Sequence, residues 1–174
     1  EYLDGKKWNG KGYYVDIEKD NCNITHKIKG EREPIIDKSK FYYEIKDGKG
    51  YMIDYDDEDS IYEGDYLNGE RNGNGRDYKK YGDSLIIYDG EYLNGKRNGK
   101  GREYQAIAIE SAICGNSKLC FEGDYLNGRK WNGKGYDNND IVYEIKNGKG
   151  YIKEYNNIKL IFEGEYLKGE INGK

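Results

Sequence analysis

The side chains best suited to metal binding or nucleophilic chemistry are few. The chain has three cysteines, Cys22, Cys114 and Cys120, and a single histidine, His26. A structural zinc site needs about four such ligands, so these residues suffice only if two distant segments meet. A Cys–His nucleophile pair also needs a pocket and an orienting group. We therefore predict no catalytic residue, no metal and no cofactor, and we expect a surface histidine and free thiols in a protein that is not an enzyme.

Two other patterns could bind ions. An acidic run comprises Asp54, Asp56, Asp57, Glu58 and Asp59. It lacks the glycine and the distal glutamate of an EF-hand loop, so we interpret it as a solvated turn. The segment Gly148-Lys149-Gly150 resembles part of a phosphate loop. Such a loop must lead from a strand into a helix, and this segment instead lies within a repeated hairpin pattern, which argues against a nucleotide site.

Composition narrows the class of protein. Charged residues make up 36% of the 174 residues, and apolar residues make up 35%. A thick hydrophobic core is therefore not expected, although the 14% aromatic content argues against disorder. The net charge is −4, without a basic stripe, so we expect no nucleic acid partner and find weak support for charge-driven lipid binding. Three cysteines favour a reducing, cytoplasmic location.

The elements that must position any functional surface are repeats. Tyr66-Leu67-Asn68-Gly69 is followed by Gly73-Asn74-Gly75, and the same phrase returns from Tyr92, Tyr125 and Tyr166. The distance from Tyr43 to Tyr66 is 23 residues, which is enough for two strands and two turns. The sequence therefore predicts an array of one supersecondary unit.

Side-chain alternation assigns the faces of this unit. Within residues 61–67, Tyr62, Gly64 and Tyr66 share one face, and Ile61 and Leu67 lie on the other. Residues 68–73 have turn chemistry, and residues 74–78 return as a second strand. We expect a tyrosine ring of a neighbouring strand to cover Gly73 and Gly75, because aromatic cover offsets the poor strand preference of glycine. The predicted fold is all-β: an elongated, curved, single-layer antiparallel sheet of tandem β-hairpins, open-ended.

A second form of the unit, with a turn predicted to be shorter, spans residues 43–51 and 143–151. Both forms together give seven units, which start at Glu1, Tyr43, Tyr62, Tyr88, Phe121, Tyr143 and Phe162. Irregular insertions interrupt the array at residues 14–40 and 105–120. We expect residues 1–174 to form one array, cut from a longer one.

The motif Tyr62-Glu63-Gly64-Asp65-Tyr66, with Gly73 and Gly75, resembles the MORN (membrane occupation and recognition nexus) repeat. The motif recurs from Tyr88, Phe121 and Phe162. The chain differs by using tyrosine where the family often has tryptophan, and by placing leucine directly after it. The resemblance implies scaffolding, self-association and attachment of cytoskeletal or membrane-proximal complexes. It also implies lipid binding, and repeats that in some members accompany a kinase or methyltransferase domain.

Two rows of side chains are the candidate partner-binding residues. The tyrosine row comprises Tyr66, Tyr92, Tyr125 and Tyr166, and the leucine row comprises Leu67, Leu93, Leu126 and Leu167. An open aromatic groove accommodates a helix or an extended peptide, but rings packed on glycines would be inaccessible. The leucines, together with Ile61, Ile87 and Ile161, form a second apolar stripe that needs cover. We expect a non-catalytic scaffold that binds proteins or itself, laterally or end to end; a lipid-surface module and a targeting segment of a larger enzyme are the alternatives.

Overall fold

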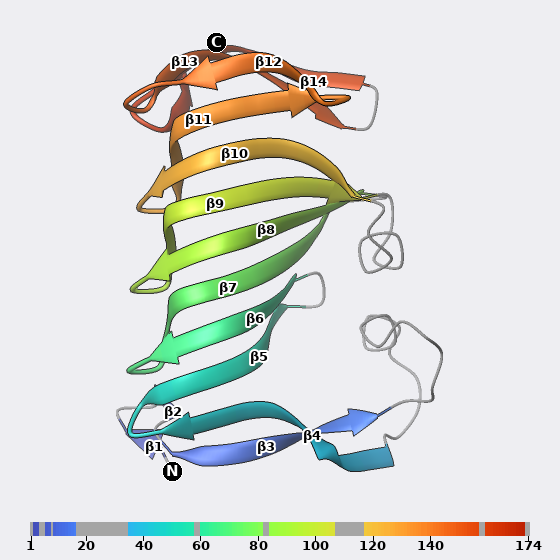
Figure 1. The fold of residues 1–174 in the computed structure, drawn as a ribbon, viewed down its shortest axis with the longest axis vertical. Coiled ribbons are helices and arrows are strands. Elements are labelled where there is room, and N and C mark those ends of the chain that lie inside the picture. The colour runs from blue at the N-terminus through green and yellow to red at the C-terminus, as the bar shows by residue number, and fades with distance from the viewer. Residues whose placement is uncertain are drawn as a thin grey trace.

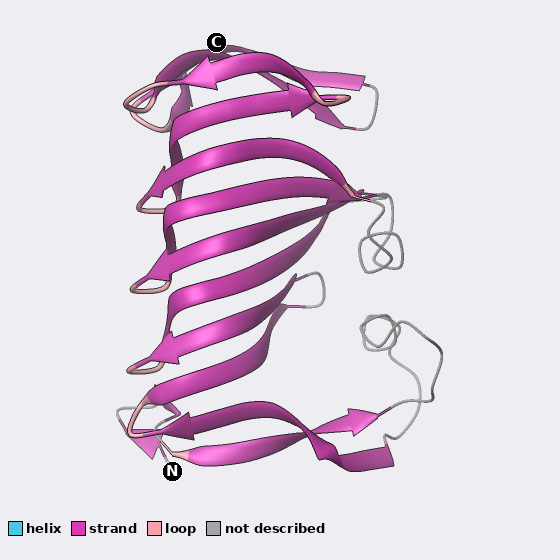
Figure 2. Ribbon diagram, viewed as in Figure 1, coloured by secondary structure: helices cyan, strands magenta, loops and turns pink. Residues whose placement is uncertain are grey.

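The computed structural model describes residues 2–3, 6–7, 9–16, 35–57, 60–81, 84–106, 117–156 and 159–172. Every secondary-structure element in these residues is a β-strand (Figure 2). Strands lie side by side along the long axis of an elongated molecule, with the N- and C-termini at opposite ends (Figure 1). The predicted all-β array of antiparallel hairpins is confirmed.

The strands follow one another in chain order. They are β1 (Tyr2–Leu3), β2 (Lys6–Lys7), β3 (Gly10–Asp16), β4 (Ile35–Lys46), β5 (Lys49–Asp57), β6 (Ser60–Leu67), β7 (Glu70–Tyr81), β8 (Ser84–Leu93), β9 (Lys96–Ala106), β10 (Lys118–Leu126), β11 (Arg129–Asp137), β12 (Asp140–Ile145), β13 (Lys149–Asn156), β14 (Lys159–Leu167) and β15 (Glu170–Asn172). Strands β3 to β12 form one ten-stranded sheet, in which each strand pairs with its neighbours in the chain. Its outermost strands, β3 and β12, do not pair with each other, so this sheet is open.

The second sheet contains β13, β14 and β15, and β1 pairs with β2 alone. The two sheets adjoin at a seam between β12 and β13, where a single bridge joins Lys146 and Lys149. The hairpin of nearly identical sequence, β4–β5, instead pairs along residues 43–46 of its first strand. The two copies of the short repeat therefore differ in how many residues of their two strands are paired.

The hairpins close through two-residue turns. Asn68 and Gly69 have φ values of 52° and 73°, which is the type I′ geometry that matches the twist of the flanking strands. Six described turns of this kind lie at one end of the strands: Asp47-Gly48, Asn68-Gly69, Asn94-Gly95, Asn127-Gly128, Asn147-Gly148 and Lys168-Gly169. A seventh, Asn138-Asn139, joins β11 and β12 at the other end. The predicted turn over residues 68–73 is wrong, because β7 already begins at Glu70. The predicted difference in turn length between the long and short forms of the repeat is also wrong, because both forms close through a two-residue turn.

Gly73, which follows the Asn68-Gly69 turn, lies in a β-bulge. Gly73 has a φ of 90°, in the left-handed region, and the pairing of β6 with β7 shifts register opposite Asp65. The Asn74 N–H donates a hydrogen bond to the Asp65 carboxylate at 3.0 Å. The equivalent residues of the next hairpin are Gly99, Lys100 and Glu91. The prediction that a tyrosine ring covers Gly73 is wrong, since the Asp65 side chain is what lies against this glycine.

For the next glycine along, the predicted ring-over-glycine packing is confirmed. A Cβ on Gly75 would lie 2.6 Å from Cζ of Tyr62, and one on Gly101 would lie 2.6 Å from Cζ of Tyr88. Each ring belongs to the neighbouring strand and rests directly on bare backbone. The absence of a side chain at these two glycines is therefore a packing requirement.

Successive turns are tied to one another. The Gly95 N–H donates to the carbonyl oxygen of Arg71 at 2.9 Å, and the Gly128 N–H donates to that of Arg97 at 2.8 Å. Similar bonds link the turns from Gly48 to Gly169. The turns therefore form a continuous column along one side of the molecule (Figure 1).

The strands run further into the predicted insertions than expected. β3 and β4 include residues 14–16 and 35–40, and β9 and β10 include residues 105–106 and 118–120. Residues 17–34 and 107–116 lie outside the described part of the chain. The side chains of Cys22, His26 and Cys114 lie there too, so their predicted roles stay predictions.

Candidate interaction surface

The tyrosine row does not form an open groove. Tyr66, Tyr92, Tyr125 and Tyr166 are each at most 7% exposed. They pack with the rings that cover the glycines to form one core cluster along the sheet. We call the side of the sheet that carries these rings the aromatic face. On this face the tyrosines contribute to packing, and they offer little surface to a partner.

The rings contact one another edge to face. Tyr62 meets Tyr92 with ring centroids 5.0 Å apart, and Tyr88 meets Tyr125 at 4.9 Å. Because each of these pairs spans two hairpins, and Tyr88 also meets Tyr92 within one hairpin at 5.4 Å, the contacts run unbroken along the array. Edge-to-face aromatic pairs add about 0.5–1.5 kcal/mol each beyond their buried area.

A cation lies over three of these rings. The guanidinium carbon of Arg71 lies 4.2 Å from the Tyr62 ring centroid, and that of Arg97 lies 4.3 Å from the Tyr88 centroid. Lys130 holds the equivalent place over Phe121, at 5.0 Å. A hairpin thus stacks glycine backbone, aromatic ring and cation in three layers.

Carboxylates neutralise these cations. Arg97 pairs with Asp77 at 2.7 Å and with Glu103 at 2.8 Å, and the Lys130 ammonium pairs with Glu103 at 2.8 Å. Lys130 also reaches Glu154 of β13 at 3.5 Å, across the seam. The result is a largely buried network of alternating charge. Burial opposes ionisation of Glu103, but Lys130 and Arg97 outweigh it and lower the pKa of this carboxyl.

Some tyrosine hydroxyls join this network. Tyr66 donates a hydrogen bond to the Asp54 carboxylate at 3.2 Å, and Tyr92 donates to Asp77. Burial raises the pKa of Tyr66 to about 12. The predicted solvated turn is therefore wrong for Asp54, which lies in β5 and contributes to the aromatic face. The side chains at positions 56–59 lie outside the description.

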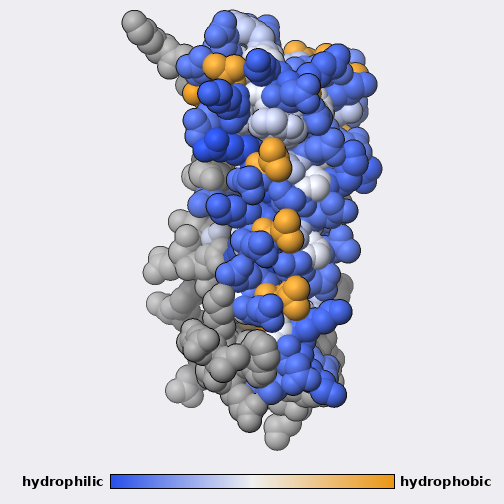
Figure 3. Space-filling view, turned by 90° about the vertical axis from the view of Figure 1, so that its left-hand side faces the viewer, coloured by the Kyte–Doolittle hydropathy of each residue, from blue (hydrophilic) through white to orange (hydrophobic). Residues whose placement is uncertain are grey.

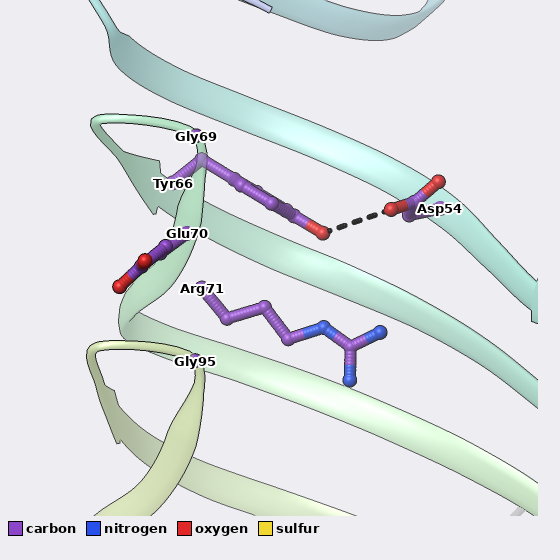
Figure 4. A pocket seen from close by; sticks show the side chains of 6 residues that line it. All are labelled: Asp54, Tyr66, Gly69, Glu70, Arg71 and Gly95. Atoms are coloured by element: carbon purple, nitrogen blue, oxygen red, sulfur yellow. Dashed lines mark hydrogen bonds between the residues drawn. The ribbon is translucent and has the colours of Figure 1, made fainter. Parts of the chain in front are cut away.

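Figure 4 shows a cleft at the rim of the aromatic face, where Asp54, Tyr66 and Arg71 meet two turns. Its volume is about 270 Å³, and Gly69, Glu70 and Gly95 complete its lining. This is at the lower limit for small-molecule sites. The Tyr66–Asp54 hydrogen bond crosses it, so its polar groups are already engaged with one another.

The leucine row is exposed. Leu67, Leu93, Leu126 and Leu167 are 39–49% exposed, and each directly precedes a turn. We call these four residues the leucine ridge. Figure 3, which faces the turn side, shows apolar groups in single file between hydrophilic neighbours.

The rest of the predicted second stripe is covered. Ile61 and Ile87 are both 5% exposed and belong to a second core cluster with Tyr78, Leu85 and Ala106. The side chain of Ile161 lies outside the description. On the face opposite the aromatic face, the apolar side chains that lie far from the turns are therefore buried, and the leucines next to the turns are exposed.

The turn column is basic. We define a turn segment as the two turn residues with one residue on either side, so that the six described turns of this column give residues 46–49, 67–70, 93–96, 126–129, 146–149 and 167–170. The basic residues in these segments are Lys46, Lys49, Lys96, Arg129, Lys146, Lys149 and Lys168; the acidic ones are Asp47, Glu70 and Glu170. An edge with an excess of basic residues thus runs along a chain whose net charge is −4.

Charge on the remainder of this face is paired. Arg76 pairs with Asp89, and Arg102 pairs with Glu122 at 2.7 Å, with side chains that are 43–56% exposed. Such exposed pairs contribute about 0–1 kcal/mol each. In the turn column, Arg129 pairs with Glu170 and Lys146 pairs with Glu144, but basic residues there outnumber acidic ones.

Comparison with known proteins gives no relative. No model of a known protein family matches this chain, and no curated protein sequence matches it. The repeats and the surface they present are therefore the features that bear on function.

Two further findings concern other classes of site. Among the residues that the structure describes, no group of three or more His, Cys, Asp or Glu side chains is arranged to hold a metal ion. No described helix is long and apolar enough to cross a membrane. Cys120 is a free thiol, and burial raises its pKa.

Sequence reasoning missed the cations of the aromatic face. Arg71, Arg97 and Lys130 follow the tyrosine of their repeats by five residues. This recurrence of a basic residue was a usable signal. In the repeat from Tyr166 the same position holds Ile171, which is 51% exposed, so the stack is not continued there.

Proposed function

We propose that this chain is a non-catalytic, MORN-like repeat scaffold that binds proteins, or a second copy of itself, through the leucine ridge. The observation that carries the proposal is the exposure of the same residue in successive repeats, in single file. A monomeric protein has no structural need for apolar side chains at regularly spaced exposed positions. The aromatic face supports the role indirectly, because its buried rings stiffen the array that spaces the leucines.

The test is a variant in which Leu67, Leu93 and Leu126 are all replaced by serine. Light scattering after size-exclusion chromatography measures self-association of the parent chain and the variant over a range of concentrations. Ile141→Ser is the matched control, because Ile141 is 56% exposed but lies outside the turn column. We expect the ridge variant to lose association while the control retains it.

Partner binding is tested with the same variants. A protein retained by the parent chain is purified, and its affinity for parent, ridge variant and control is measured by calorimetry. A chain that is monomeric at every concentration, and whose purified partners bind the ridge variant as tightly as the parent, would contradict the proposal.

A lipid surface is the second candidate, and the basic turn column favours it. Basic residues near an anionic bilayer contribute about 1 kcal/mol each. Flotation with vesicles containing anionic lipid, at low and high salt, tests this reading. Salt-sensitive flotation that is lost in Lys49→Glu/Lys96→Glu would support it, and absence of flotation at low salt would exclude it.

A further inference from the structure

The leucine ridge has a fixed spacing. Leu67, Leu93 and Leu126 precede the turns of three consecutive hairpins, and the first two are separated by the width of two strands. Neighbouring strands lie about 4.8 Å apart, so successive leucines are spaced by about 9.6 Å. The hydrogen bonds from Gly95 to Arg71 and from Gly128 to Arg97 hold the turns in place. The spacing is therefore built into the backbone.

Charge beside the ridge is unbalanced. Lys49 lies opposite Leu67 in the β5–β6 pairing, and Lys96 lies opposite Leu93 in the β8–β9 pairing. Both lysines are exposed, and neither has an ion pair with a described residue. Glu70 lies opposite Leu67 on the other side, in the β6–β7 pairing. The charge in line with the leucines is therefore positive on balance, with two lysines against one glutamate.

We propose that the leucine ridge binds an acidic amphipathic α-helix that carries an apolar residue at every seventh position. The proposal rests on the proposed function and specifies the partner. Seven helical residues rise about 10.5 Å, which is within about 1 Å of the interval between leucines. Carboxylates beside the apolar line of the helix then meet Lys49, which precedes Leu67 along the ridge, and Lys96, which lies between Leu93 and Leu126.

Other occupants fit less well. In an extended strand, residues that span the same interval point to opposite faces, so a strand would present only alternate anchors. A bilayer gains little from these leucines, because each is already more than half buried in its own sheet. A helix keeps one apolar line in contact with successive leucines of the ridge.

The probe is a synthetic peptide of three heptads, with leucine at one position of each heptad, glutamate at the flanking positions and alanine elsewhere. Fluorescence anisotropy measures its Kd for the chain, and circular dichroism measures its gain of helix on binding. We expect Leu67→Ser/Leu93→Ser/Leu126→Ser to weaken binding at least about tenfold, and Ile141→Ser to leave it unchanged. A peptide with lysine in place of glutamate is expected not to bind.

Charge is tested separately from apolar contact. Lys49→Glu/Lys96→Glu is expected to weaken binding of the acidic peptide and to reduce its dependence on salt. A peptide with the same composition, but with leucine spaced so that no two lie on one helical face, is expected to bind at least about tenfold more weakly. Unfolding in urea confirms that each variant is folded before its affinity is read.

Three outcomes would overturn the inference: no binding of the acidic peptide, binding that survives the triple serine variant, or ridge-dependent binding to anionic vesicles without binding of the peptide. The proposed function fails separately. If self-association or purified-partner binding depends on the ridge while the acidic peptide does not bind, the scaffold role stands and the helical partner is wrong.

Discussion

The two faces of the hairpin β8–β9 are made from the same strands but differ in almost every physical respect. On one side, Tyr88 is fully buried between glycine backbone and the Arg97 guanidinium. On the other side, Arg102 pairs with Glu122 in water, and Leu93 is 49% exposed. The comparison indicates that a one-layer sheet divides its tasks by face: cohesion between neighbouring repeats on one side, and surface available to partners on the other.

Alkaline pH should give the largest effect, because it acts on the whole aromatic face. Burial raises the pKa of Tyr66 to about 12, and it raises the pKa of Tyr62, Tyr88 and Tyr92 above the ordinary value. Their stabilising contribution is complete below the unfolded pKa of about 10 and is lost as pH rises through the folded values.

We therefore expect cooperative loss of β-sheet circular dichroism above pH 10, in step with phenolate absorbance of the buried tyrosines. Titration of these phenols well before any loss of sheet signal would contradict the burial of the rings. Added salt should shift this transition little, because desolvation is the main cause.

Tyr88→Ala compared with Leu93→Ala tests the two faces directly. Removing a buried ring typically lowers the free energy of unfolding by about 3–5 kcal/mol, and here the ring also supports Tyr92 and Tyr125. Leu93 is half exposed, so we expect a loss below about 1 kcal/mol. Urea unfolding measures both; equal losses would remove the distinction between the faces.

Glu103→Gln should rank next. It removes the shared counter-charge of Arg97 and Lys130, and breaking one partner of a buried pair typically costs about 3 kcal/mol. Because the pKa of Glu103 is lowered in the folded chain, its contribution is present above its ordinary pKa and is lost as pH falls below it. The variant should therefore lose part of the parent's acid sensitivity, as measured by urea unfolding at several pH values.

Gly75→Ala compared with Gly95→Ala separates ring packing from backbone strain. The methyl group on Gly75 would meet the Tyr62 ring, and overpacking of this kind costs about 1–3 kcal/mol. Gly95 faces open space but has a φ of 78°. The expected loss of stability is therefore only the cost of a left-handed backbone at alanine, about 1–2 kcal/mol. Thermal unfolding should show the larger loss for Gly75→Ala, accompanied by a change in tyrosine near-ultraviolet dichroism that Gly95→Ala lacks.

The smallest effect is expected for the exposed pair Arg102–Glu122. A double-mutant cycle with alanine at both positions should give a coupling energy of about 0–1 kcal/mol that decreases in high salt. A coupling comparable with that of Glu103 and Lys130 would show that the two faces share the work of stabilisation.

Side-chain alternation and the recurrence of the tyrosines were enough to predict the hairpins, the two faces and the ring-over-glycine packing at Gly75. These features depend on local spacing, which a single sequence displays directly. The exposure of Leu67 and its relatives next to the turns could not be separated from the burial of Ile61, because both lie on one face and differ only in their distance from the turn.

The turn and the cation layer show where local reading stops. Residues 68–73 are so rich in Gly and Asn that they resemble one long turn, yet Asn68-Gly69 closes the hairpin and Gly73 serves a bulge. The equivalent bulge at Gly99 sets which residues of β8 and β9 face one another, and the place of Arg97 over Tyr88 depends on that register. Register across strands is a tertiary property, and the sequence alone did not reveal it.

The seam between β12 and β13 has a mechanical consequence. The strands run across the long axis (Figure 1). A force that stretches the molecule end to end therefore pulls neighbouring strands directly apart, along the hydrogen bonds between them. Within residues 10–172, the junction with one backbone bridge, Lys146 to Lys149, should part first under such a load. Lys130 and Glu154 would then act as a short tether across the opening. The array would extend in a defined step at one place before any hairpin unravels.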